Sequence, residues 1–169
     1  GGTGPDRQGA SGVNGKIVGI VLGAAMLIAG GGMWYLQEYY FYDRIPADSP
    51  TAALAVTTAT GSDALTISDF QGIDADSSPL RWRACATVQD IPAEPTPYPD
   101  ATPLIGPRWF DCFDARQIGA DLESGAAQAV LGQTDIRPDV DRVFAIYPDG
   151  RIFGWHQYSE KNPERGVMD

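Results

Sequence analysis

Two cysteines and one histidine are the side chains of this chain best suited to redox, metal or acid–base chemistry. Cys85 and Cys112 are the only cysteines, and His156 is the only histidine. In an oxidising compartment an even cysteine count favours a bridge. A bridge here closes a loop of about 28 residues and contributes roughly 3 kcal/mol in the chain-entropy model. Redox-active pairs are usually closer in sequence, as in Cys-x-x-Cys, so we predict a structural disulfide.

His156 lies between Trp155 and Gln157 in an expected strand. A general base needs a partnered nucleophile or carboxylate in a suitable arrangement, and the sequence supplies no known one. A copper site made from both cysteines and His156 would use suitable ligands, but no second motif ligand accompanies them. We therefore expect a histidine whose hydrogen bonds are satisfied within a sheet.

Clustered carboxylates occur in two short segments. The EF-hand pattern for calcium also needs a glycine and a terminal glutamate, which both segments lack. Asp and Ser side chains bond to local backbone in turns, so we predict turn chemistry. We also find no Walker loop, dinucleotide fingerprint, zincin motif or nucleophile elbow, and we expect a protein that is not an enzyme, with no metal or cofactor. The segments comprise Asp74, Asp76, Ser77 and Ser78, and Asp135, Asp139 and Asp141.

Strand patterns dominate the part of the chain that contains these residues. Apolar and polar residues alternate over 65–70 and 80–88, and in the second segment Arg81 and Arg83 share a face that we expect to be partly wet. A hairpin is predicted over 142–158, turning at Pro148-Asp149-Gly150. Residues 127–131 are a further candidate for a short strand.

One short helix and one long loop complete this region. Asp114 is a good N-cap, Gln117 occupies the reciprocal N3 position, and Gly125 ends the helix after Ser124. Six prolines between 89 and 108 exclude an interior strand. A loop of this length is usually functional or disordered, so we regard it as a candidate partner-binding segment. These prolines are Pro92, Pro95, Pro97, Pro99, Pro103 and Pro107.

The fold class that follows is α+β, with an antiparallel sheet and one short helix behind an N-terminal transmembrane helix. We divide the chain into a flexible cytoplasmic tail, the transmembrane helix with its aromatic belt, a linker with a candidate first strand, the α+β domain and a C-terminal tail. Their ranges are 1–15, 16–42, 43–62, 63–160 and 161–169.

Residues 17–36 contain no charged side chain. As a helix they span roughly 30 Å, the thickness of a bilayer's hydrocarbon core. Eight strongly apolar residues contribute roughly −4 kcal/mol to insertion. A cleaved signal peptide is the competing interpretation, with Ala29-Gly30-Gly31 as a cleavage site, but the apolar stretch exceeds the usual signal length.

Residues flanking the span predict its orientation and contacts. Arg7 and Lys16 precede it, whereas acidic residues dominate after it, so we expect a cytoplasmic N-terminus and a periplasmic domain at a bacterial inner membrane. Small residues at a spacing of four allow helices to approach closely, and aromatic rings prefer the lipid headgroup layer. The expected packing face is Gly15, Gly19 and Gly23, and the expected interface anchors are Trp34, Tyr35, Tyr39, Tyr40, Phe41 and Tyr42.

The net charge of −10 comes from the part of the chain after the span, where 20 acidic and 10 basic residues follow position 42. This excess argues against nucleic acid as a partner. It is consistent with plain solubility or with docking of a basic partner.

Three segments resemble a family of alphaproteobacterial single-span membrane proteins with no assigned chemistry. The resemblance covers most of the chain from Lys16 to Tyr158. It implies an inner-membrane protein with a periplasmic domain, and it supplies no catalytic residues. The segments are 73–81, 109–115 and 154–157.

Our leading hypothesis is an accessory subunit of an energy-transducing membrane complex, with cytochrome c oxidase or its supercomplex as the expected host. The helix would contact host subunits and lipid, and the acidic domain could help dock a basic cytochrome c. Three alternatives remain: an accessory subunit of a photosynthetic reaction-centre and light-harvesting complex, an assembly factor, or a periplasmic thiol or metal-delivery protein.

Overall fold

The protein is represented by a computed structural model that describes residues 14–159. The chain divides into two compact units, Gly1–Gln37 and Glu38–Asp169, and each is described by itself. The tails expected at 1–15 and 161–169 lie outside the described residues, apart from positions 14 and 15.

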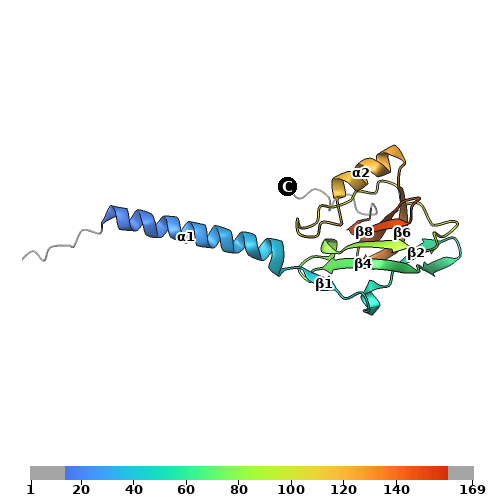
Figure 1. The fold of residues 1–169 in the computed structure, drawn as a ribbon, viewed down its shortest axis with the longest axis horizontal. Coiled ribbons are helices and arrows are strands. Elements are labelled where there is room, and N and C mark those ends of the chain that lie inside the picture. Colours follow the sequence, from blue (N-terminus) through green and yellow to red (C-terminus); the bar gives the residue numbers. More distant parts are fainter. Residues whose placement is uncertain (1–13, 160–169) are drawn as a thin grey trace, which may run out of the picture. The chain divides into compact units, whose positions relative to one another are not determined.

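α1 (Gly15–Tyr35) is the apolar helix predicted from the sequence (Figure 1). The Asn14 side chain accepts a hydrogen bond from the backbone N–H of Lys16 at 3.1 Å and so caps the first turn. No residue of α1 is buried, and the helix with its continuation, Gly15–Tyr40, is long and apolar enough to cross a membrane. A helix that is apolar on all sides needs hydrocarbon or protein around it.

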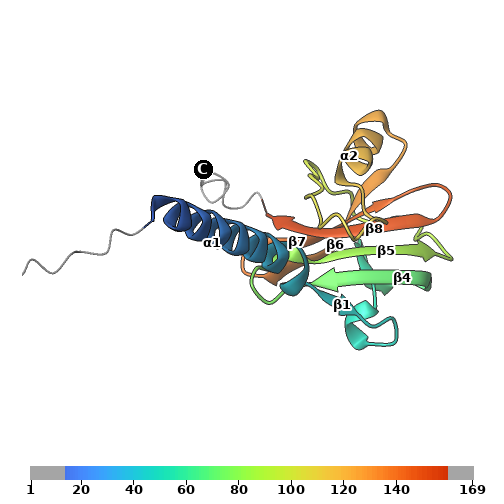
Figure 2. The same cartoon turned by 60° about the vertical axis from the view of Figure 1, so that its left-hand side comes forward.

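One six-stranded antiparallel sheet organises the second unit (Figure 2). Every neighbouring pair of strands in it is antiparallel. In spatial order the strands are β1 (Asp43–Ile45), β4 (Ile67–Asp74), β5 (Arg83–Val88), β8 (Arg151–Tyr158), β7 (Val140–Ile146) and β6 (Gln128–Arg137).

Both faces of this sheet are covered. α2 (Ala115–Ser124) lies over one face in both ribbon views (Figures 1 and 2), where Trp155, Phe113 and Ile118 belong to one apolar core. On the other face a small hairpin, β2 (Ala55–Thr58) and β3 (Gly61–Ala64), helps to cover a second core around Trp82 and Phe144. The central strands are therefore buried on both sides.

The second core depends on a close approach to a glycine. A Cβ on Gly154 would lie 2.7 Å from Trp82 Cζ3 and 2.8 Å from Phe144 Cε1. Those distances are shorter than any normal contact between carbon atoms. Glycine in β8 thus makes room for two aromatic rings that fill this side of the sheet.

Most elements agree with the sequence-based predictions. The α+β class is confirmed, as is α2 with Asp114 at its N-cap and Gly125 left-handed at φ 78° after its last turn. The β7–β8 hairpin turns at Pro148–Gly150 as predicted. In the segment predicted as a strand over 80–88, the structure has a 3₁₀ turn, η3 (Pro79–Arg81), before β5 begins. Residues 43–62 contain β1, a 3₁₀ turn η2 (Pro50–Ala52) and β2.

Candidate functional site

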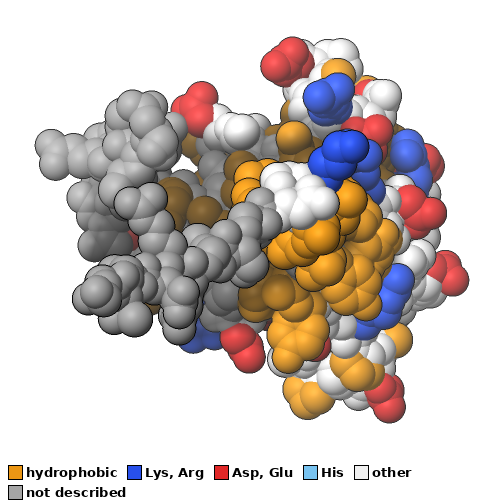
Figure 3. Space-filling view, turned by 90° about the vertical axis from the view of Figure 1, so that its left-hand side faces the viewer, with side chains coloured by type: hydrophobic (Ala, Val, Ile, Leu, Met, Phe, Trp, Pro, Cys, Tyr) orange, Lys and Arg blue, Asp and Glu red, His pale blue; other side chains and the backbone are white. Residues whose placement is uncertain are grey.

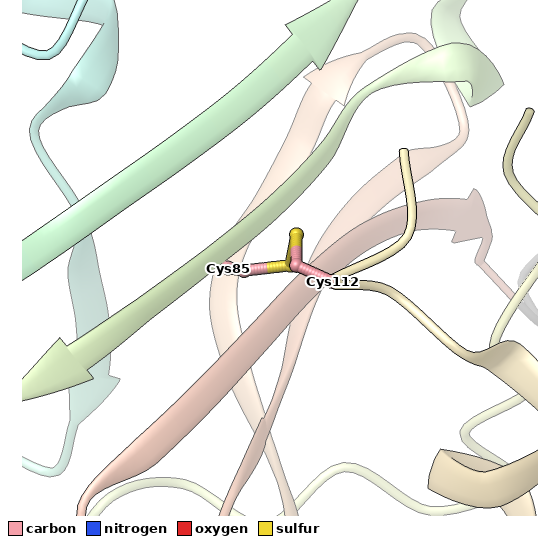
Figure 4. Close-up of a disulfide and its surroundings, with 2 residues drawn as sticks. All are labelled: Cys85 and Cys112. Carbon is pink, nitrogen blue, oxygen red and sulfur yellow. A yellow bond between two sulfur atoms is a disulfide. The ribbon is translucent and has the colours of Figure 1, made fainter. Parts of the chain in front are cut away.

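The predicted disulfide joins Cys85 on β5 to Cys112 in the segment before α2, with their Cα atoms 6.4 Å apart (Figure 4). Cys85 is buried and Cys112 is half-buried, and both pack in the core on the α2 side of the sheet. Thiol exchange requires an approach to sulfur, so burial makes this pair suited to a structural role.

Arg83 contradicts the expectation of a partly wet face on this strand. Its side chain is only 3% exposed, because α2 and the long loop cover that face of β5. Nε donates to the Leu104 carbonyl at 2.8 Å and Nη2 donates to the Ile105 carbonyl at 3.3 Å. Nη1 donates at 2.6 Å to the carbonyls of both Leu80 and Trp82. Burial lowers the pKa of Arg83 to about 10, so the group stays cationic at neutral pH.

The proline-rich loop is ordered against the domain by backbone hydrogen bonds. Thr96 N donates to Thr57 O at 2.8 Å, and Thr96 O accepts from Leu131 N at 2.8 Å. Tyr98 N donates to Ala129 O at 3.0 Å. Because proline lacks an N–H, the residues between prolines make these bonds. The loop joins β2 to the β6 edge and protects that edge from pairing with another chain.

The two acidic segments lie in different places. In the second, Asp141 Oδ1 accepts from the Asp135 backbone N–H at 2.9 Å, and Asp141 Oδ2 accepts from Tyr98 Oη at 3.0 Å. The first bond lies within the β6–β7 hairpin, whereas the second joins β7 to the long loop. In the first, Asp74 Oδ1 accepts from Ala75 N at 2.8 Å, and Asp76 is exposed. Among residues 14–159, His, Cys, Asp and Glu side chains do not gather in groups of three or more suited to a metal ion.

His156 is buried, and each ring nitrogen has a partner, as the sequence predicted. Nδ1 donates to the Pro79 carbonyl at 2.7 Å, and Nε2 then accepts from Arg142 Nε at 3.1 Å. The proton is assigned to Nδ1 from this network. Burial lowers the pKa of His156 to about 4, and nearby Arg142 contributes in the same direction. The imidazole is therefore neutral at pH 7 and serves as a fixed acceptor.

Arg142 lies beside His156 because the two are direct cross-strand partners in the β7–β8 hairpin. The Arg142 guanidinium carbon is 4.0 Å from the centroid of the Trp82 ring, and the His156 ring stacks on the same tryptophan at 4.8 Å. Trp82 and His156 together hold the guanidinium in one orientation. Sequence reasoning identified the histidine but missed this arginine, although the predicted turn already fixed the register that pairs them.

A pocket of about 560 Å³ opens beside Arg142 and His156. It brings together residues from the end of β4, the η3 turn and the β6–β7 connection, which are far apart in sequence. Its charged and polar lining contains two carboxylates, two guanidinium groups, one hydroxyl and one imidazole. These residues are Asp74, Asp76, Arg137, Arg142, Thr51 and His156.

Within the second unit, Trp109 holds the first residues of that unit, from Glu38 to Tyr42. Trp109 Nε1 donates to the Glu38 carbonyl at 2.6 Å, and the Arg108 backbone N–H donates to Glu38 Oε1 at 2.8 Å. The Trp109 ring stacks with Tyr39 at 6.4 Å and meets the edge of Tyr42 at 6.2 Å. Two of the predicted interface anchors therefore also pack against protein, and their contact with lipid stays a prediction.

The other anchors and the packing face belong to exposed parts of the chain. Trp34 and Tyr35 are 59% and 57% exposed, and Tyr40 and Phe41 are 70% and 40% exposed. A Cβ built on Gly15, Gly19 or Gly23 meets no atom within 4 Å. Figure 3 shows uncovered hydrophobic side chains facing the viewer.

The fold and these sites define a class: an α+β domain with a buried disulfide, preceded by one helix able to span a membrane. The chain belongs to a family of unknown function, DUF6446, whose sequence model matches residues 52–164. The match includes both cysteines, Arg83, Arg142 and His156, and it begins after the apolar helix. Neither a curated protein nor a solved structure matches the chain.

Proposed function

We propose that the protein is a non-catalytic, single-span subunit of a larger membrane complex. The observation that carries this proposal is α1, a helix without any buried residue. Its Gly15, Gly19 and Gly23 positions are open to the approach of another backbone. Lipid satisfies apolar side chains, but close helix–helix packing uses small residues of this kind. A partner helix in the membrane would cover unburied apolar side chains of α1 and pack closely against its glycines.

The charges of the domain support a basic partner outside the membrane. Most of its acidic side chains are exposed, whereas Arg83 is buried and Arg81 and Arg142 are half-buried. The accessible surface is therefore more acidic than the composition alone implies. Complementary charge raises association rates between proteins. The first combination to test is a basic cytochrome c as the soluble partner and cytochrome c oxidase, or its supercomplex, as the host.

The arrangement supports a periplasmic domain with a cytoplasmic N-terminus. Basic residues precede the helix, and Glu38, Asp43 and Asp48 follow it. The disulfide also fits an oxidising compartment. Protease added to intact spheroplasts should then digest or release the domain, and a domain that stays protected would overturn this orientation.

Copurification tests the proposed function. A tagged full-length chain extracted in mild detergent should bring stoichiometric host subunits with it, and recovery of the chain alone would refute the proposal. Haem absorbance in the purified material indicates an oxidase host, whereas bacteriochlorophyll bands indicate a photosynthetic one. An assembly factor would associate only with immature complexes.

A pair of helix variants sharpens this test. Gly19→Leu adds a side chain on the expected packing face, and Gly32→Leu adds the same side chain on the opposite face. Neither glycine contacts another part of the chain, so both variants should insert into the membrane. Loss of the host only with Gly19→Leu supports packing through this face. Equal recovery of the host with both variants contradicts it.

A further inference from the structure

The Arg142 side chain has only part of the hydrogen bonding that a guanidinium can make. Its Nε donates to His156 Nε2, and its flat face lies on Trp82. Within residues 14–159, no acceptor bonds to its two terminal nitrogens. These nitrogens form the fork that binds a carboxylate with two parallel hydrogen bonds. Trp82 and His156 have therefore fixed the orientation of a fork that remains open.

The Arg142 guanidinium also has no direct ion pair among residues 14–159. Partial burial lowers the pKa of its guanidinium, and Asp74 is the acidic group that acts against this shift. Among residues 14–159, the ion pair found within 4.0 Å joins Arg151 to Asp149, at the far hairpin turn. A partly buried cation is favoured by an anion in contact with it. What Arg142 lacks is a negative group in direct contact with its two terminal nitrogens.

Two carboxylates, Asp74 and Asp76, line the same pocket. Partial burial raises the pKa of the Asp74 carboxyl and Asp76 adds to this rise, whereas Arg142 and Arg137 act against it. Asp74 uses one oxygen to accept from Ala75 N. Two neighbouring carboxylates repel each other, and a cation between them removes that repulsion. An ammonium group is therefore favoured beside these two carboxylates.

We propose that this pocket binds a small molecule carrying a carboxylate and an ammonium group, as a free α-amino acid does. The carboxylate receives two hydrogen bonds from the Arg142 fork, and Arg137, which also lines the pocket, adds positive charge. The ammonium donates to Asp74 and Asp76. The volume of about 560 Å³ lies within the range of small-molecule sites and admits a side chain as well.

Thermal unfolding of the full-length chain in detergent tests this binding. The amino acids other than cysteine, whose thiol could exchange with the disulfide, and the poorly soluble tyrosine are added separately at about 10 mM. Sodium acetate, methylammonium chloride and sodium phosphate serve as partial probes. A ligand that binds the folded state raises the unfolding midpoint. We expect at least one amino acid to raise it and the three partial probes to leave it unchanged. If no amino acid raises the midpoint, or if acetate or phosphate raises it equally, the proposal is wrong.

Variants assign the effect to the pocket. Arg142→Lys keeps the charge but removes the fork, and we expect at least tenfold weaker binding of the active amino acid. Asp76→Asn changes an exposed side chain, so it tests ammonium recognition without threatening the fold, and we expect a similar loss. Arg151→Gln, at the distant turn, should bind normally. Wild-type affinity in both Arg142→Lys and Asp76→Asn would overturn the proposal.

Discussion

Arg83 and Arg142 are two arginines in one sheet with opposite surroundings. Arg83 lies under the long loop and donates to four backbone carbonyls. Arg142 lies on the other face, beside an open pocket, with one imidazole acceptor and an aromatic ring. The first group is satisfied by its own chain, which makes it structural. The second is oriented but incomplete, which is the condition expected of a binding group.

The largest expected difference comes from removing each arginine in turn. Arg83→Met leaves buried carbonyls without donors, so the free energy of unfolding should fall by about 3–5 kcal/mol. Arg142→Met loses one hydrogen bond and a ring contact at a partly open site, so its fall should be about 1 kcal/mol. Urea unfolding of both variants in detergent, followed by tryptophan fluorescence, measures the two values. Equal losses would remove the distinction between a structural arginine and a binding one.

The disulfide gives the next largest effect, because it ties the same loop as Arg83. Replacing both Cys85 and Cys112 by alanine should lower the free energy of unfolding by about 3 kcal/mol. The loop is then held by Arg83 and by backbone bonds, so combining this change with Arg83→Met should cost a different amount from the sum of the separate losses. A double-mutant cycle by urea unfolding measures the coupling. Strict additivity would show that the two ties act independently.

Acid should lower the stability of the folded protein through His156, the hydrogen-bond acceptor for Arg142. His156 has a folded pKa of about 4, below its ordinary value of 6.5. The unfolded chain therefore binds a proton that the folded chain does not, and stability should fall as the pH drops from about 6.5 to 4. The loss is at most about 3 kcal/mol. In His156→Gln, the free energy of unfolding should depend less on pH across this window than in the wild type. An unchanged pH dependence would assign the acid sensitivity to other groups.

The smallest expected loss of unfolding free energy comes from Trp109, whose indole N–H bonds to a backbone carbonyl. Trp109→Phe keeps the aromatic ring but removes the hydrogen bond from Nε1 to the Glu38 carbonyl. We expect a loss of about 1 kcal/mol. Hydrogen exchange should then become faster at residues 38–42, while the pocket around Arg142 keeps its wild-type rates. Unchanged exchange in that segment would show that ring stacking alone holds it.

The sequence predicted local elements well and long-range assembly poorly. α2 carries its own signals at Asp114 and Gly125, and the β7–β8 hairpin carries its turn residues, so both were predicted. Arg83 was misjudged because alternation assigns a face but cannot say what covers it. The cover is the loop at Leu104 and Ile105, which is far along the chain.

The pocket shows where a sequence signal existed and was not used. The predicted turn at 148–150 sets a register that pairs Arg142 with His156. That pairing of an arginine with the only histidine was available from the sequence. Asp74 and Trp82 were not, because they reach the site through the order of strands in the sheet, which single-sequence patterns do not determine.

The buried bridge between Cys85 and Cys112 has a practical consequence for anyone producing this protein. Chains made where glutathione keeps thiols reduced lack the cross-link across 27 positions. Such material would keep its β-rich circular dichroism while melting at lower temperature. A recombinant preparation should therefore be exported, or oxidised during refolding, before its binding or assembly is measured.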